Sequence, residues 1–412
     1  MFTTPRIFKK RAYIACLALP IHLCSLASAQ NFTMQIAHPD PLGLRNVIPG
    51  ADELGLGMTD GMKGDYDYGV GMTSIFDTNF FIDESNEKSE FSTYVSPYLS
   101  YRSDPEGGAR VSFTASYTPV MRAYLHNSDL NDVDQSGMAT MKIVGGKTLI
   151  TAYAKYAELS GSDRLSGGFV TGSLVNLGVQ GAYQIAPRTT LSAQWTAAMS
   201  DYGTDEGVGS DLYTLQFGGF WAASERLSFG PSIRYMMTES DNIGSRDAWS
   251  LSMQAQYLVG ERIRFVGSLG VEYAKNSGDG EKDTIGLTGD LTGSYSFNDR
   301  WAWSTFAQYA TVPSPTEAGY VVNNLELTSQ LERQLLRGVL GFGMEYNLSM
   351  YENVDTLSDD LDNENNLNVF ISYRRNLISE RVGFDAKIAY TVNDGETDWS
   401  QLQLSAGLSV TF

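Results

Sequence analysis

Hydrophobic and polar residues alternate along most of the chain, most clearly in its last twelve residues. From Gln401 to Phe412, apolar residues at even positions alternate with Gln, Ser, Gly and Thr at odd positions. A period of two predicts a β-strand whose two faces lie in different environments. Eighteen such stretches can be followed, at residues 68–77, 90–102, 109–121, 135–144, 148–158, 172–184, 190–200, 211–221, 226–237, 247–258, 263–273, 284–297, 301–311, 321–331, 336–349, 366–374, 381–392 and 400–412. Their lengths suit strands that cross a bilayer, which need about 9–11 residues each.

The connections between these stretches alternate in length and in charge. Short turns, nearly all with an Arg or Lys, follow the even-numbered stretches: SDPEGG before Ala109, GGK before Thr148, APR before Thr189, SER before Leu227, GER before Ile263, NDR before Trp301 and ERQ before Leu335. Longer, mostly acidic loops follow odd-numbered stretches, at residues 77–90, 125–135, 200–211, 275–283 and 351–365. Short turns at one rim and long loops at the other are typical of outer-membrane barrels, with turns periplasmic and loops extracellular.

The predicted fold is therefore all-β: a transmembrane antiparallel β-barrel over residues 67–412, with about eighteen strands. Sixteen strands remain the alternative, if residues 68–77 and a weak stretch such as 321–331 do not join the wall. The last edge strand of a soluble β-sandwich would also explain residues 401–412 taken alone. A sandwich gives no reason for the regular alternation of short basic turns and long acidic loops.

The first 29 residues have the pattern of a secretory signal peptide. Arg6, Lys9, Lys10 and Arg11 precede an apolar run, and Ala27-Ser28-Ala29 ends in a small-residue cleavage site. The apolar run is too short for a membrane-spanning helix, which needs about 20 residues. Residues 30–66 are rich in Gly, Pro and Asp and keep no period. We expect an irregular arm there, in the periplasm or inside the lumen.

Charge and cysteine content narrow the function classes. Both cysteines lie in the leader, and loss of the leader's four basic residues takes the net charge from -19 to -23. Nucleic acid is therefore excluded as a partner on charge grounds. A barrel exported by this route is expected in the outer membrane of a Gram-negative cell envelope, in contact with lipid and lipopolysaccharide.

Parity along the stretches predicts which side chains face the lumen. The apolar set faces lipid, so charges at the opposite parity point inward, because charge on the lipid face is costly. The predicted pore-lining residues are Arg102, Arg110, Arg122, Lys142, Lys155, Arg234, Arg264, Glu272, Asp290, Arg337, Arg381 and Lys387. Arg374 also has inward parity, as do Glu326, Glu345 and Asp385. Basic residues outnumber acidic ones in this set, which predicts a wall attractive to anions. Pairing of these charges across strands is the alternative.

Catalytic and metal chemistry find little support in the sequence. The mature chain holds only His38 and His126, and a hydrolase would need a histidine held beside its nucleophile. His126 and its neighbouring aspartates are the one arrangement of this kind. The acidic runs at residues 129–134 and 359–364 are candidates for Ca²⁺ but lack the spacing of a helical calcium loop. We expect no catalytic residue, no metal site and no cofactor.

Two resemblances add to this reading. The alternating stretch that ends in Phe412 resembles the terminal strand of outer-membrane barrels, which implies that Phe412 is an assembly signal for the barrel assembly machinery. The segment Asp77-Thr-Asn79-Phe-Phe81, followed by a strand with Ser96-Pro97 in its middle, resembles the start of the β-barrel porin type 2 family. That family implies the barrel but no particular solute; some members are associated with exopolysaccharide export.

The predicted function is passive diffusion of small hydrophilic solutes through the lumen. One alternative is export of an exopolysaccharide, for which inward Tyr94, Tyr98, Tyr153 and Phe220 would serve as stacking residues. The other is a structural or adhesive barrel with a plugged lumen. A homo-oligomer is compatible with the sequence, which does not reveal a wall that would contact a neighbour.

Overall fold

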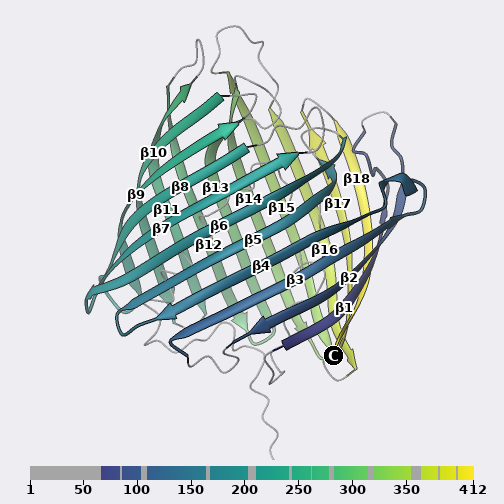
Figure 1. Ribbon diagram of the computed structural model, residues 1–412, viewed down its shortest axis with the longest axis horizontal. Coiled ribbons are helices and arrows are strands. Elements are labelled where there is room, and N and C mark those ends of the chain that lie inside the picture. Colours follow the sequence, from purple (N-terminus) through teal and green to yellow (C-terminus); the bar gives the residue numbers. More distant parts are fainter. Residues whose placement is uncertain are drawn as a thin grey trace, which may run out of the picture.

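The computed structural model is a closed barrel of eighteen antiparallel strands (Figure 1). It describes residues 66–83, 86–103, 109–163, 168–202, 210–240, 244–260, 262–277, 283–313, 320–353, 363–378, 381–395 and 398–412. The strands are β1 (Tyr66–Asp77), β2 (Glu90–Arg102), β3 (Val111–Tyr124), β4 (Asp132–Val144), β5 (Thr148–Asp163), β6 (Gly168–Ala186), β7 (Thr189–Tyr202), β8 (Ser210–Ala222), β9 (Leu227–Ser240), β10 (Gly244–Val259), β11 (Ile263–Ser277), β12 (Thr284–Asn298), β13 (Trp301–Pro313), β14 (Tyr320–Leu335), β15 (Gly338–Asn353), β16 (Glu364–Ile378), β17 (Val382–Asp394) and β18 (Trp399–Thr411).

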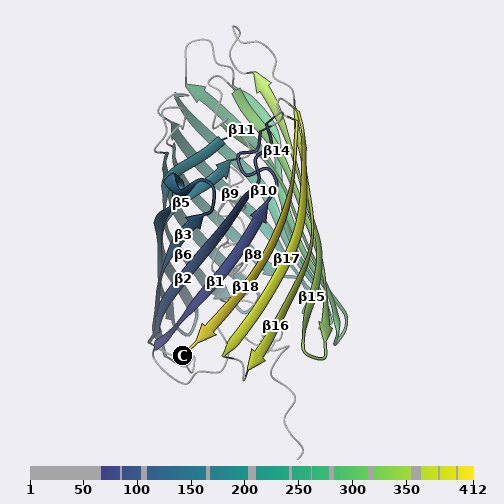
Figure 2. The same cartoon turned by 90° about the vertical axis from the view of Figure 1, so that its right-hand side faces the viewer.

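Each strand pairs with its neighbours in the sequence, and β1 pairs with β18 to close the wall. Closure satisfies the backbone hydrogen-bonding groups that an open sheet would leave at its edges. Figure 2 shows β1 and β18 side by side at this seam. The predicted barrel is confirmed, and the sixteen-strand alternative is wrong because both β1 and β14 are full members of the wall.

The strand limits differ from the predicted ones in informative places. The turn predicted at Glu332–Gln334 is wrong, because β14 continues to Leu335 and the turn is formed by Leu336 and Arg337. The loop predicted at 125–135 is shorter, because β4 already begins at Asp132. A 3₁₀ turn, η2 (Ser128–Leu130), lies between β3 and β4. The barrel wall begins at Tyr66, and the predicted signal peptide and residues 30–65 lie outside the described residues.

Burial in this fold is the reverse of that in a soluble domain. The largest fully buried side chains are polar, namely Gln254, Glu90, Asn79, Asn366 and Ser96. Large apolar side chains lie instead on the exposed face of the wall. No helix among the described residues is long and apolar enough to span a membrane.

Candidate functional site

The register of the closed sheet assigns the side chains of each strand alternately to two faces. On one face, Leu269, Leu251 and Ile388 are 68%, 61% and 54% exposed. Apolar side chains of neighbouring strands share this face, as cross-strand pairs such as Trp195 with Leu215 and Leu251 with Val271 show. The opposite face is polar and more shielded, as expected for side chains that converge on the concave side of a barrel.

Nine of the twelve residues predicted to line the pore lie within strands, on this inner face: Arg102, Arg122, Lys142, Lys155, Arg234, Arg264, Glu272, Asp290 and Lys387. The other three, Arg110, Arg337 and Arg381, occupy turns and are exposed at the short-turn end of the barrel. The predicted stretches began at residues 109, 336 and 381 and so included these arginines, whereas β3, β15 and β17 begin at Val111, Gly338 and Val382.

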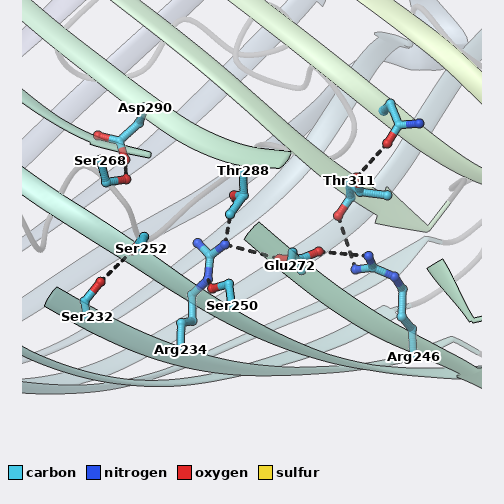
Figure 3. Close-up of polar contacts among 11 residues, drawn as sticks. Ser232, Arg234, Arg246, Ser250, Ser252, Ser268, Glu272, Thr288, Asp290 and Thr311 are labelled. Carbon is cyan, nitrogen blue, oxygen red and sulfur yellow. Dashed lines mark hydrogen bonds and ion pairs between the residues drawn. The ribbon is translucent and has the colours of Figure 1, made fainter. Parts of the chain in front are cut away.

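The inner wall contains a buried network of two arginines and one glutamate (Figure 3). Glu272 of β11 accepts from Arg246 Nη2 at 2.9 Å and from Arg234 Nη2 at 3.3 Å. Arg246 also donates to the carbonyl oxygen of Thr311 at 3.2 Å. The side chain of Arg234 is more exposed than that of Arg246, and it additionally donates to the hydroxyls of Ser250 and Thr288, each at 3.2 Å. The two positive charges therefore share one buried carboxylate.

Arg246 was not among the predicted pore residues, although it is on the inner face of β10. The predicted stretch began at Asp247, whereas β10 begins at Gly244. A strand longer by three residues would have given Arg246 the same parity as Ser250 and Ser252. Its partner Glu272 lies on the adjacent strand, near the loop end of the barrel.

A second buried ion pair joins β3 to β4. Arg122 Nη2 lies 2.6 Å from Asp134 Oδ1, and both side chains are almost fully buried. The guanidinium also donates to the carbonyl oxygen of Ser160 at 2.6 Å and to its hydroxyl. Asp134 was part of the candidate calcium run, but the register of β3 and β4 places it on the inner face, where its carboxylate pairs with Arg122.

Inner-face acids outside the pore-lining set change the charge balance that the sequence suggested. Pairing registers place on the inner face the acids Asp67, Asp77, Glu90, Asp132, Asp134, Glu332 and Glu364, in addition to Glu272, Asp290, Glu326, Glu345 and Asp385. Several of these lie at strand ends, where the predicted stretches were too short. Others are paired, as Glu332 is with Arg374 at 3.0 Å. Within the described residues, the inner wall is therefore not predominantly basic.

A hollow in the inner wall lies beside Arg234. The hollow is open to the lumen, and the space of about 390 Å³ in front of its lining belongs largely to the lumen. Its lining comes from β8 to β13. Serine, threonine and glutamine side chains make up most of the lining, together with Arg234 and Asp290. Asp290 accepts a hydrogen bond from Ser268, and the hydroxyls of Ser232 and Ser252 are 2.7 Å apart (Figure 3). The hollow thus offers mainly hydrogen-bond donors and acceptors, and no hydrophobic residue is among the described residues that line it.

The segment after β1 closes the seam at the loop end. Asp77 Oδ2 accepts from Gln401 and Gln403 of β18, at 2.8 and 2.9 Å. Asn79, fully buried, donates to the carbonyl oxygens of Asp83 and Ser400. The sequence Asp77-Thr78-Asn79 therefore serves as a polar clasp between the first and last strands.

Aromatic packing continues from this clasp. The ring of Phe80 lies 5.1 Å from that of Tyr124 on β3 and 5.8 Å from that of Phe169 on β6. Ile82 is buried with φ at 56°, a conformation that is costly for a β-branched residue. The buried contacts of the segment must compensate for this cost. Sequence reasoning used these residues only as a family motif and missed the clasp.

The candidate catalytic histidine, His126, lies at the start of the β3–β4 connection, beside the buried carboxylate of Glu90. His126 Nδ1 lies 3.5 Å from Glu90 Oε1, and its imidazole is 65% exposed. Glu90 is buried and accepts from the backbone N–H groups of Phe91, Leu125 and His126. This carboxylate anchors the start of the β3–β4 connection. Among the described residues, no group of three or more His, Cys, Asp or Glu side chains is arranged to hold a metal ion.

Comparison with known proteins gives structural matches alone. No protein-family model and no curated protein sequence matches the chain. OpdL of Pseudomonas aeruginosa is 14% identical, with 84% of this chain and 99% of that chain covered and a TM-score of 0.46. OccAB3 of Acinetobacter baumannii is 13% identical, with 84% and 100% covered and a TM-score of 0.46. OccK2 (OpdF) of P. aeruginosa is 11% identical, with 84% and 98% covered and a TM-score of 0.48.

Proposed function

We propose that this chain is an outer-membrane channel through which small hydrophilic solutes diffuse passively. The observation that carries the proposal is the opposite character of the two faces of one closed wall. Apolar side chains cover the outside, as at Leu251 and Leu269, whereas the inside is lined by hydroxyl, amide and charged groups. A wall of this kind is stable in lipid and presents polar groups to water. Eighteen strands enclose enough space for an aqueous path.

The same proposal includes the orientation of the barrel in the outer membrane and its route to that membrane. The acidic loops would lie outside the cell, near lipopolysaccharide, and the short basic turns would lie in the periplasm. Delivery would require removal of residues 1–29 and recognition of Phe412 by the barrel assembly machinery. Membership of the β-barrel porin type 2 family belongs to this proposal, and it rests on the motifs around Asp77 and Ser96. The proposal also includes assembly into a homo-oligomer, which the mass of the detergent-folded barrel would test.

Two lysines would carry a preference for anions. Lys142 of β4 and Lys155 of β5 face the lumen, and neither forms an ion pair with a described residue. Arg122 and Arg246, by contrast, are neutralised by buried carboxylates. A fixed charge with no partner attracts mobile counter-ions most strongly. Anion preference is therefore proposed to arise at the β4–β5 wall.

Ion selectivity in a planar bilayer tests this assignment. The wild-type barrel is expected to conduct with an anion-biased reversal potential in a salt gradient. Replacing both lysines, Lys142→Glu with Lys155→Glu, should lower the anion-to-cation permeability ratio several-fold. Lys147→Glu makes the same charge change in the exposed turn before β5 and should shift the potential much less. An unchanged reversal potential in the double variant would remove these lysines from the conducting path.

The polysaccharide-export alternative gains no specific support from the three inward tyrosines. Tyr98 and Tyr153 lie flat against the wall at Gly69 and Gly178, where a Cβ would come within 2.5 and 2.3 Å of the rings. Covering a strand glycine with a cross-strand aromatic ring stabilises a sheet. Tyr94 is buried, with its ring 6.5 Å from that of Tyr124. Wall packing therefore accounts for these three tyrosines.

A further inference from the structure

We propose that the hollow over β8 to β13 is a binding station for neutral polyhydroxylated solutes, that is, for sugars and related polyols. This inference rests on the proposed function, because it assumes that solutes pass along the inner wall. It goes beyond that function in naming the chemical class of a solute and the part of the wall that contacts it.

The charges around the hollow argue against a charged ligand. Arg234 and Asp290 both line it, and they carry opposite charges. Arg234 also contacts Glu272, a carboxylate that it shares with Arg246, so that the two guanidinium groups are balanced by the two carboxylates of Glu272 and Asp290 together. An anion attracted by Arg234 would meet the carboxylate of Asp290, and a cation attracted by Asp290 would meet the guanidinium. Neither sign of charge is favoured over the whole hollow.

The hydrogen-bonding groups match a polyol. Serine and threonine hydroxyls and the amides of Gln216 and Gln308 line the hollow, and each of these groups can both donate and accept. Ser250 and Thr288 accept from Arg234, which leaves their O–H groups as donors to a ligand, whereas Ser232 and Ser252 bond to each other. Asp290 accepts from Ser268 through Oδ1, and no other described residue donates a hydrogen bond to it. Oδ2 is thus available to a ligand hydroxyl. A molecule with many neighbouring hydroxyls can satisfy this set, whereas an apolar or singly polar solute cannot.

The expected affinity is low, as a conducting path requires. No aromatic side chain is among the described residues that line the hollow, so ring stacking on a sugar does not contribute. Hydrogen bonds exchanged with water contribute little net free energy each. Binding is therefore expected to be roughly millimolar, strong enough to enrich the solute at the wall and weak enough to release it.

Saturation-transfer difference NMR of the detergent-folded barrel tests the proposal without requiring conduction. The probe is sucrose, and potassium gluconate serves as a polyhydroxylated anion. Sucrose is expected to bind, with gluconate at least fivefold weaker. Asp290→Asn should weaken sucrose binding about tenfold, which corresponds to about 1.4 kcal/mol. Ser252→Leu fills the hollow and should abolish binding.

The matched control is Ser405→Leu, on the inner face of β18 and remote from the hollow in the strand order. It should leave sucrose affinity within twofold, and the heat-modifiable band on gels verifies folding of every variant. Equal binding of sucrose by wild type and Ser252→Leu, stronger binding of gluconate, or absence of sucrose binding to the folded barrel would overturn the proposal. A barrel that binds sucrose but passes no solute would instead refute the channel and leave the site standing.

Discussion

A lysine in place of Leu269 is expected to destabilise the barrel in a bilayer by about 2–4 kcal/mol. Leu269 is near the middle of β11, on the outer face, and is 68% exposed. At this depth a lysine would bring its charge into hydrocarbon, where water cannot solvate it. The measurement is the free energy of unfolding in lipid vesicles, from a urea titration followed by tryptophan fluorescence.

The adjacent residue provides the control at the same depth. Ser268 is on the inner face of β11, where it donates to the carboxylate of Asp290. Ser268→Lys places the same charge in the lumen, beside an acid, and is expected to change stability by less than about 1 kcal/mol. A similar loss in both variants would mean that the two faces do not lie in lipid and water as assigned. Destabilisation by Ser268→Lys but not by Leu269→Lys would mean that the face of Ser268 lies in lipid and the face of Leu269 in water.

Deletion of Phe412 is expected to reduce the amount of folded barrel in outer membranes several-fold. The backbone N–H of Phe412 donates to the carbonyl oxygen of Tyr68 at 2.9 Å, and the two rings stack with centroids 5.8 Å apart. The deletion therefore removes a contact across the seam as well as the residue that the resemblance identifies as an assembly signal. The measurement is the heat-modifiable fraction in isolated outer membranes.

Two comparisons separate the roles of Phe412. Phe412→Tyr retains the ring and the backbone hydrogen bond, so it should assemble close to the wild-type level. Refolding of the deletion variant into detergent should be impaired much less than its assembly in cells, because one seam contact is a small part of the wall. Normal assembly of the deletion variant would show that the C-terminal residue is not read as a signal.

The strand pattern was predictable because alternation is a local property. Each strand must place apolar groups outward at every second position, so the sequence alone identifies β2 at its correct limits and the terminal stretch within one residue. The ends of strands were less predictable. Beyond the lipid layer the outward residues become polar, and the alternation that marked β10 disappears before Arg246.

Contacts between strands were not predictable from parity. Parity places Arg234 and Glu272 on one face, but their pairing depends on the cross-strand register, which aligns both with Ser250 of the intervening strand β10. The same is true of Arg122, which reaches Ser160 on β5. Because of these ion pairs, arginines that were predicted to line the pore hold neighbouring strands together instead of facing the lumen as unpaired charges. The clasp at Asp77 and Asn79 was likewise invisible, because its partners are more than 300 residues away in the chain.

Swelling of liposomes that contain the purified barrel is the most direct measurement of the central claim. The account predicts rapid swelling in isotonic solutions of small hydrophilic solutes such as glycine and arabinose, and progressively slower swelling as solute size increases, because diffusion through a water-filled lumen is limited by its width. Swelling that equals that of protein-free liposomes, with barrel shown to be folded by its heat-modifiable mobility, would contradict an open channel.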